Sequence, residues 1–321
     1  MTASGEKINE SLIFHSGIPG KPVVILIHGL GMNSHLWTDP GKCFVLGGLA
    51  PLTIFLTDSS GKTDKPVSMG VVDPRIQGFW HRLAAEGFSI VSWSQSQPLG
   101  PIASAIDELK KTVAWVHRKW PAEQIYLVGH SRGGLIARKY LLMEEPGNVA
   151  GLVTICSPHA GTQMAKYAGY LTPTGSLLEK ILPAESQTAV TTALKRLSLF
   201  LQSPAIEELR PAADFIQSIG DPLPEKLRLL SFGGTSPALF QVYYKFNQNN
   251  EFTALKFPDL LVRAVPAVFL PPELTPGSGD ALVSSLSSRL AGSTHYDHPV
   301  NHVKAAFDTD IQDAIGGFLN A

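Results

Sequence analysis

Apolar residues in this sequence alternate between short unbroken runs and longer stretches with helical spacing. Residues 77–86, 102–119 and 305–319 place apolar side chains every three or four positions, which predicts amphipathic helices. The unbroken runs have the length and β-branched content of strands that are buried on both faces. They are residues 22–28, 88–93, 149–156 and 226–234. Since strands that alternate with helices form parallel sheets, the pattern predicts an α/β fold.

The most informative stretch is residues 125–134, Ile-Tyr-Leu-Val-Gly-His-Ser-Arg-Gly-Gly. Its first four residues predict a buried strand, and apolar residues recur at helical spacing directly after it. Between the strand and the helix, Gly129-His130-Ser131-Arg132-Gly133 matches the pattern G-x-S-x-G. A strand, a tight turn and a helix hold the central serine on a strained backbone with its hydroxyl exposed. Ser131 is therefore the expected nucleophile.

Two segments together resemble the bacterial lipase and esterase branch of the α/β-hydrolase superfamily. The first is the strand 22–28, which runs into His28-Gly29-Leu30-Gly31, and the second is the G-x-S-x-G turn. The resemblance covers most of the chain except residues 33–72 and 236–276. It implies an α/β-hydrolase fold, in which helices flank a mostly parallel central sheet and a helical cap is inserted.

The resemblance also implies an oxyanion hole and a catalytic acid. In the family, the oxyanion hole would be formed by backbone N–H groups that correspond to those of Leu30 and Arg132. The segment Gly279-Asp280-Ala281-Leu282-Val283-Ser284 resembles the Asp-Gly-Leu-Val-Pro turn that carries the family's acid. The match is partial, because an alanine and a serine stand where the family has glycine and proline. Asp280 is nevertheless the expected acid.

Three histidines near the end of the sequence compete for the role of base: His295, His298 and His302. The base must lie on a loop after the last strand, because only there does it reach the serine from the carboxyl edge of the sheet. Residues 295–300 alternate as a short strand does, so His302 is the expected base and His298 the main alternative. Asp297 is a rival acid, but it lies too close to the base in sequence to come from a separate loop.

The mechanism that these residues imply needs no cofactor, because Ser131, His302 and Asp280 supply nucleophile, base and orienting acid. The bacterial lipases that the sequence resembles often hold a structural calcium through an aspartate two residues after the histidine. Lys304 occupies that position here, and its charge opposes a cation, so no metal is expected. His159 follows the wrong strand to be the base, and we interpret it as structural.

The chain is expected to form a single α/β-hydrolase domain over residues 1–321. Residues 163–221 are expected to form a helical cap, because Ser203-Pro204 predicts a helix start and four residues form one apolar stripe. The stripe consists of Val190, Leu194, Leu197 and Leu201. Helices that merely pack on the sheet are the alternative to a cap. Residues 33–72 predict either an apolar flap near the acyl site or an extra hairpin on the core, and residues 236–276 have no predicted role.

Composition narrows the classes of function. Of the 321 residues, 44% are hydrophobic and 17% are charged, which predicts a globular core. The net charge of −1 argues against nucleic acid as a partner and against purely electrostatic docking to membranes. The two cysteines, Cys43 and Cys156, do not indicate a disulfide framework. Residues 1–10 lack the apolar core of a signal peptide, so a cytoplasmic location is expected, although a secreted mature chain would look the same.

The expected function is that of a serine carboxylic ester hydrolase, of esterase or lipase type, acting on a small-molecule or lipid ester. An acyltransferase or a thioesterase could use the same three residues, and an inactive binding protein could keep the same fold. The sequence leaves open the acyl-chain length, the oligomeric state and any transient contact with a lipid surface.

Overall fold

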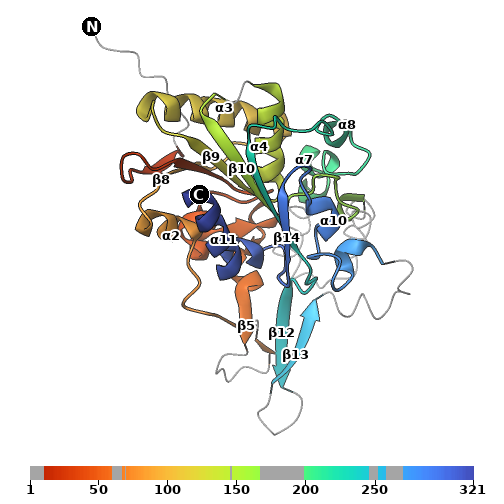
Figure 1. Ribbon diagram of the computed structural model, residues 1–321. Coiled ribbons are helices and arrows are strands. Elements are labelled where there is room, and N and C mark those ends of the chain that lie inside the picture. The colour runs from red at the N-terminus through yellow and green to blue at the C-terminus, as the bar shows by residue number, and fades with distance from the viewer. Residues whose placement is uncertain are drawn as a thin grey trace.

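A mostly parallel sheet of seven strands forms the centre of the protein (Figure 1). The computed structural model describes residues 11–59, 67–68, 70–144, 147–166, 199–245, 252–257 and 270–321. In order across the sheet, the strands are β1 (Ile13–His15), β8 (Ser89–Ser92), β2 (Val23–Ile27), β9 (Ile125–His130), β10 (Val149–Ile155), β11 (Arg228–Gly234) and β14 (Thr294–His298). β1 runs antiparallel to β8, and every other neighbouring pair in this sheet is parallel. The predicted mostly parallel sheet is thus confirmed.

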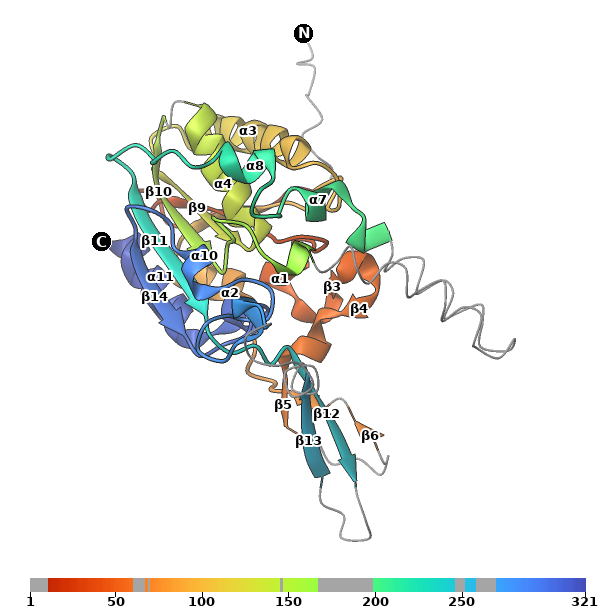
Figure 2. The same ribbon diagram turned by 90° about the vertical axis from the view of Figure 1, so that its right-hand side faces the viewer.

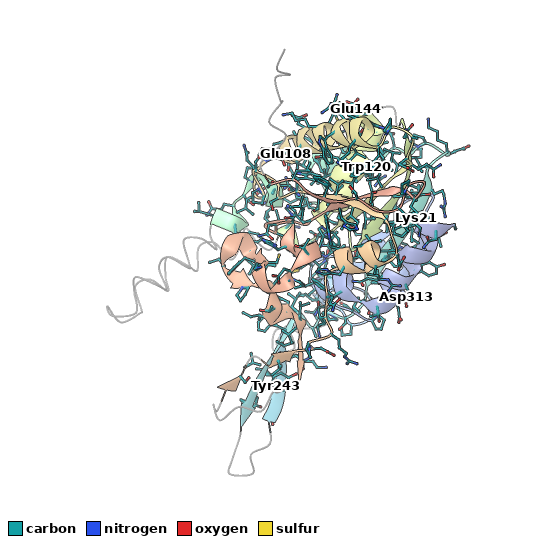
Figure 3. The ribbon with its side chains drawn as sticks, turned by 90° about the vertical axis from the view of Figure 1, so that its left-hand side faces the viewer. Lys21, Glu108, Trp120, Glu144, Tyr243 and Asp313 are labelled. Carbon is teal, nitrogen blue, oxygen red and sulfur yellow. The ribbon has the colours of Figure 1, made fainter. Side chains whose placement is uncertain are left out.

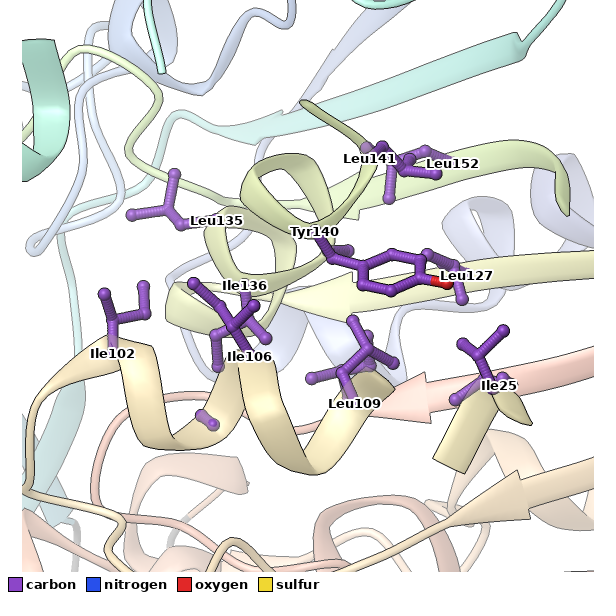
Figure 4. Packing of buried hydrophobic residues seen from close by; sticks show 14 of the residues in the cluster. Ile25, Ile102, Ile106, Leu109, Leu127, Leu135, Ile136, Tyr140, Leu141 and Leu152 are labelled. Atoms are coloured by element: carbon purple, nitrogen blue, oxygen red, sulfur yellow. The ribbon is translucent and has the colours of Figure 1, made fainter. Parts of the chain in front are cut away.

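Helices cover both faces of this sheet. α3 (Ile102–Lys119) and α4 (Arg132–Met143) pack on one face, where Figure 4 shows their apolar side chains against those of the strands. α2 (Phe79–Ala85) and α11 (Thr309–Asn320) pack on the opposite face. Every residue of β2 and β9 is buried, because a parallel sheet between two helical layers has no solvated face. Within the described ranges, no helix is long and apolar enough to cross a bilayer.

The predicted helices are present, but not all of their bounds are as predicted, since the helix predicted over 77–86 is α2, Phe79–Ala85. The helix predicted over 102–119 is α3, with the same bounds. The helix predicted over 305–319 begins instead at Thr309, so its predicted start was wrong. Asp308 has an extended backbone, and its side chain accepts a backbone N–H of the first turn at 3.0 Å, which caps α11. Lys304–Phe307 form a separate 3₁₀ turn.

The predicted cap, residues 163–221, is described only in part. Residues 167–198 lie outside the described residues, and with them lie Val190, Leu194 and Leu197 of the predicted stripe. α7 (Pro204–Glu207) begins where the sequence predicted a helix start, with Ser203 at the N-cap position. A second short helix, α8 (Asp214–Gln217), follows it.

The two insertions, residues 33–72 and 236–276, join each other in space. The first contains α1 (His35–Thr38), the paired strands β3 (Phe44–Val45) and β4 (Ala50–Pro51), and the 3₁₀ turns Leu46–Gly48 and Leu52–Leu56. It continues with β5 (Thr57–Ser59), β6 (Val67–Ser68) and β7 (Val71–Val72). The second contains the hairpin of β12 (Phe240–Lys245) and β13 (Phe252–Phe257). β6 pairs with β12, and the resulting three-stranded sheet projects from the body of the molecule (Figure 2).

Candidate active site

Ser131 sits at the sharp turn between β9 and α4. Its backbone torsions, φ 54° and ψ −126°, are ones that non-glycine residues rarely adopt, and only 7% of the residue's surface is exposed. A Cβ at Gly129 would collide with the backbone of Gly134, and one at Gly133 with the carbonyl oxygen of Ile27. The glycines of the G-x-S-x-G motif are therefore required by close approach of the backbone, which matches the geometry expected of a nucleophile turn.

The structure brings the predicted nucleophile, base and acid together. Ser131 Oγ lies 2.9 Å from His302 Nε2, and His302 Nδ1 lies 2.9 Å from Asp280 Oδ2. Asp280 Oδ1 accepts the backbone N–H groups of Leu282 at 3.0 Å and Val283 at 2.7 Å, which fixes the carboxylate. Because the carboxylate accepts from Nδ1, His302 carries its proton there and leaves Nε2 free to accept from the serine hydroxyl.

The rival residues lie elsewhere. His298 is at the end of β14, where its Nδ1 is 3.7 Å from Asp308 Oδ1. His295 Nδ1 hydrogen-bonds Ser231 Oγ at 2.8 Å, and His295 Nε2 hydrogen-bonds Asp297 Oδ1 at 3.1 Å. This second serine, histidine and aspartate array was not predicted from the sequence. Ser231 is fully buried in β11, so a substrate has no access to its hydroxyl.

The loop that carries Leu30 approaches the serine closely. A Cβ at Gly29 would lie 3.0 Å from Ser131 Cβ, and Leu30 and Ser131 line the same cavity. Arg132 is the first residue of α4, and its N–H is one of the four that lack an acceptor within a helix. The two predicted oxyanion-hole residues thus lie on either side of Ser131, Leu30 on the loop after β2 and Arg132 at the start of α4.

His28 and Gln95 connect this loop to the segment after β8. Burial lowers the pKa of His28 to about 4, so its ring is neutral at neutral pH. The backbone N–H of Gln95 donates to His28 Nε2 at 3.0 Å, and the protonated Nδ1 therefore donates to the carbonyl oxygen of Gly29 at 2.9 Å. The side-chain amide of Gln95 also donates to the carbonyl oxygen of His28, at 3.1 Å.

The side chain of Arg132 reaches the same segment from the other side. Its fully buried guanidinium donates to the carbonyl oxygen of Gly100 at 2.6 Å and lies 3.5 Å from Gln95 Oε1. Burial lowers the pKa of Arg132 to about 10, but Glu208 lies 3.6 Å away and favours the charged form. Residues 95–100 thus contact both the loop of Leu30 and the side chain of Arg132. Gln95 and Glu208 were not predicted from the sequence, because no motif marks contacts between segments that are distant along the chain.

Two further buried histidines lie near the site. His130 Nε2 hydrogen-bonds the carbonyl oxygen of His302 at 2.8 Å, and His159 Nε2 lies 3.2 Å from Thr154 Oγ1. Burial lowers the pKa of each ring to about 3, so both are neutral. Among the described residues, the His159 ring hydrogen-bonds Thr154 and not Ser131, His302 or Asp280, and its structural role stays a prediction.

Ser131 and His302 open onto an apolar cavity of about 380 Å³. Among the described residues that line it, Thr162 adds the one further hydroxyl, which already donates to the carbonyl oxygen of Leu282 at 2.5 Å. The apolar lining comes from the loop that carries Leu30, both insertions, the segment 199–209 and the loop that carries Asp280. It includes Leu30, Met32, Val45, Leu46, Phe55, Phe200, Leu201, Ile206, Leu209, Leu239, Phe240, Leu274 and Val283.

In the described part of the chain, two groups of side chains have the donor atoms for a metal ion. Atoms of Cys156, Asp280 and His302 lie within 4.8 Å of one another, as do atoms of His298, Asp308 and Asp310. In the first group, a metal would compete with the hydrogen bond between Asp280 and His302. In the second, Asp308 already caps α11. Lys304 lies two residues after His302, where the lipases that the sequence resembles have an aspartate ligand to calcium. Lys304 is half-buried, and burial lowers its pKa.

Comparison with known proteins places the chain in a family. The family model for the α/β hydrolase fold matches residues 22–203, which is more than half of the sequence, so the chain belongs to the α/β-hydrolase fold family. A search of curated proteins finds no significant match.

Solved structures show the same fold at low sequence identity. The mature lipase BlEst2 of Bacillus licheniformis is 14% identical, with a TM-score of 0.58 over 96% of this chain and 97% of the lipase. The propeptide form of that lipase is also 14% identical, with a TM-score of 0.59 over 97% of this chain and 53% of the longer protein. The predicted hydrolase fold is therefore confirmed.

Proposed function

We propose that the protein is a serine carboxylic ester hydrolase of esterase or lipase type. The observation that carries this proposal is the chain of hydrogen bonds from buried Asp280 through His302 to Ser131, which ends at an apolar cavity. Membership of the α/β-hydrolase family and the likeness to a lipase fold support it. An ester with an apolar acyl group matches both the nucleophile and its surroundings.

The reaction follows from the positions of these groups. His302 Nε2 removes the proton of Ser131 Oγ, which forms a bond to the ester carbonyl carbon. Asp280 accepts from Nδ1 throughout and stabilises the imidazolium without taking the proton. The imidazolium then gives its proton to the leaving alcohol, and the acyl group stays on Ser131. Water attacks the acyl-enzyme with the same base, which releases the acid and restores the serine.

The oxyanion of each tetrahedral intermediate needs donors at a fixed place. We assign this role to the N–H groups of Leu30 and Arg132, as the family resemblance implies. The N-terminus of α4 adds a partial positive charge on the same side of the serine. Removal of one such donor typically lowers kcat by about 100-fold or more.

The test is the Ser131→Ala variant with a p-nitrophenyl butyrate assay. We expect hydrolysis to fall by about 10⁴-fold or more while the melting temperature stays close to that of the parent. A fluorophosphonate should add to Ser131 in the parent protein. Normal turnover by the folded variant would refute the proposal, and absence of hydrolysis in the parent would favour an inactive binding protein.

The same assay separates the other enzymes that could use these residues. An acyltransferase would yield mainly a new ester when a second alcohol is added, and a thioesterase would prefer an acyl thioester over the matched oxygen ester. We expect free acid as the main product from oxygen esters in water.

A further inference from the structure

The two insertions contribute to one wall of the cavity next to Ser131. Val45, Leu46 and Phe55 come from residues 33–72, and Leu239 and Phe240 come from residues 236–276. We name these five residues the acyl wall. The rings of Phe55 and Phe240 pack edge to face, with centroids 5.9 Å apart and planes at 88°. Pairing of β6 with β12 holds the two insertions together beyond this contact, around Tyr243, which Figure 3 labels on the projecting sheet.

The first insertion is fixed against the oxyanion loop. A Cβ at Gly31 would lie 3.0 Å from the backbone nitrogen of Gly47, so the two segments touch through their backbones. Leu46, Gly47 and Gly48 all have positive φ, at 54°, 67° and 92°. The backbone of Leu46 is strained in this turn, because a non-glycine residue rarely adopts positive φ. The Leu46 side chain lines the cavity.

The second insertion is fixed against the loop of the base. Asn301 precedes His302, and its side-chain amide donates to the carbonyl oxygens of Ala238 at 2.8 Å and Leu239 at 3.2 Å. The side-chain oxygen of Asn301 accepts the backbone N–H groups of Val303 at 3.1 Å and Lys304 at 2.9 Å. One buried side chain therefore sets the position of the acyl wall relative to His302.

Both insertions present apolar side chains to the cavity. All five side chains of the acyl wall are apolar, and the hydroxyl of Thr162 in the same lining is already engaged. A polar acyl group would lose its hydrogen bonds to water and find few replacements there, whereas an aliphatic chain loses nothing. Each methylene that it buries can improve binding by up to about fourfold.

We propose that the acyl wall is the acyl-chain subsite, and that Phe55 and Phe240 limit the length of the aliphatic chain it accepts. The substrates are then esters of medium-chain aliphatic acids. This inference rests on the proposed esterase function and assigns a role to two insertions that the catalytic residues leave unexplained.

The test compares kcat/KM for p-nitrophenyl esters from acetate through butyrate, octanoate and laurate to palmitate. In the parent protein, kcat/KM should rise from acetate to octanoate and fall towards palmitate. Phe240→Ala and Phe55→Ala should move the best substrate to a longer chain and raise the ratio of laurate to butyrate by about tenfold or more. Leu239→Phe, which fills the cavity, should move the best substrate to a shorter chain.

Phe318→Ala is the matched control. Phe318 forms a similar edge-to-face pair with Tyr126, with centroids 5.8 Å apart, but it lies on α11 and does not line the cavity. The control should lose a comparable aromatic contact and keep the parent's order of substrates. Melting temperatures of all variants show which ones are folded.

A second measurement does not depend on turnover. The fluorescence of bound cis-parinaric acid would report its displacement by saturated acids from butyrate to palmitate. The measurement would compare the Ser131→Ala variant with the double variant that also carries Phe240→Ala. A shift of the best competitor to longer acids supports the acyl wall. If the folded Phe55→Ala and Phe240→Ala variants keep the parent's order of both substrates and competitors, the proposed acyl-chain subsite is wrong. Failure of the esterase function alone would remove hydrolysis but leave the shift in binding intact.

Discussion

Gln95 binds His28 through two hydrogen bonds, one from its backbone N–H to His28 Nε2 and one from its side-chain amide to the His28 carbonyl oxygen. The first bond fixes the tautomer of a buried, neutral ring, and the second fixes the backbone just before Gly29 and Leu30. Since Gln95 Oε1 also lies 3.5 Å from the Arg132 guanidinium, one side chain contacts both residues 28–30 and Arg132, which carry the assigned oxyanion-hole donors.

We therefore expect Gln95→Leu to slow catalysis more than it weakens substrate binding. Loosening of the donors should lower kcat by about 10-fold to 100-fold and change KM by less than about threefold. Steady-state kinetics would measure both values. The inhibition constant of a trifluoromethyl ketone, which forms an oxyanion at Ser131, should rise in parallel with the loss of kcat/KM.

Glu108→Gln is the control for this variant. Glu108, labelled in Figure 3, accepts from Trp93 Nε1 at 2.8 Å and from the Ser96 backbone at 3.1 Å, so it supports the same segment from α3. Within the described residues, Glu108 makes no hydrogen bond to residues 28–31 or to Arg132. An equal loss of kcat in both variants would show that Gln95 merely stabilises the segment.

The proposed base and acid give a second prediction. Asp280→Asn should keep KM nearly unchanged and lower kcat by about 10⁴-fold, because an amide favours the wrong tautomer of His302. His302→Ala should be nearly as inactive as Ser131→Ala, and the double variant should cost little more, since the residues act together. His298→Ala is the comparison, and it should retain most activity. The reverse result for the two histidines would show that the base is misassigned.

A third prediction concerns stability at acidic pH. Burial lowers the folded-state pKa of His28 to about 4, and those of His130 and His159 to about 3, from an ordinary value of 6.5. The unfolded chain therefore binds more protons as the pH falls below 6.5, and the stability present above that pH is progressively lost towards pH 4 and 3. Each histidine contributes a slope of at most about 1.4 kcal/mol per pH unit.

Urea unfolding between pH 7 and pH 5 would measure this slope. His159→Leu should lower this slope by up to about 1.4 kcal/mol per pH unit, which corresponds to one proton, whatever its effect on stability at neutral pH. A free energy of unfolding that stays level from pH 6 to pH 5 would mean that the three rings can be protonated without cost.

A fourth prediction is that activity does not depend on calcium. Lys304 places a positive side chain where the resembled lipases have a calcium ligand. Dialysis against a strong chelator should leave both the rate of hydrolysis and the melting temperature unchanged. Loss of activity that calcium restores and magnesium does not would point to ligands elsewhere, with His298, Asp308 and Asp310 as the first group to substitute.

Local sequence patterns predicted the sheet, α3 and the turn at Ser131, because each depends on neighbouring residues. The start of α11 was wrong, since the capping side chain of Asp308 overrode an apolar periodicity that began earlier. Gln95 and Asn301 carried no local signal. Their partners lie 67 and 63 residues away in sequence, respectively, so their contacts exist only once the chain is folded. The joined insertions escaped prediction for the same reason.

The second array, formed by Ser231, His295 and Asp297, provides an internal control for the reactivity of Ser131, because both serines have a neighbouring histidine in the same molecule. Ser231 has a histidine at 2.8 Å, yet Ser293 Oγ is 2.7 Å from its oxygen and the strand leaves it no exposed surface. An activity-based probe should therefore modify Ser131 and leave Ser231 untouched in the same molecule. After denaturation, neither serine should react, because neither hydroxyl then has a histidine held beside it as a base. Comparison of the two peptides by mass spectrometry would separate the contribution of the folded pocket from that of the side chains alone.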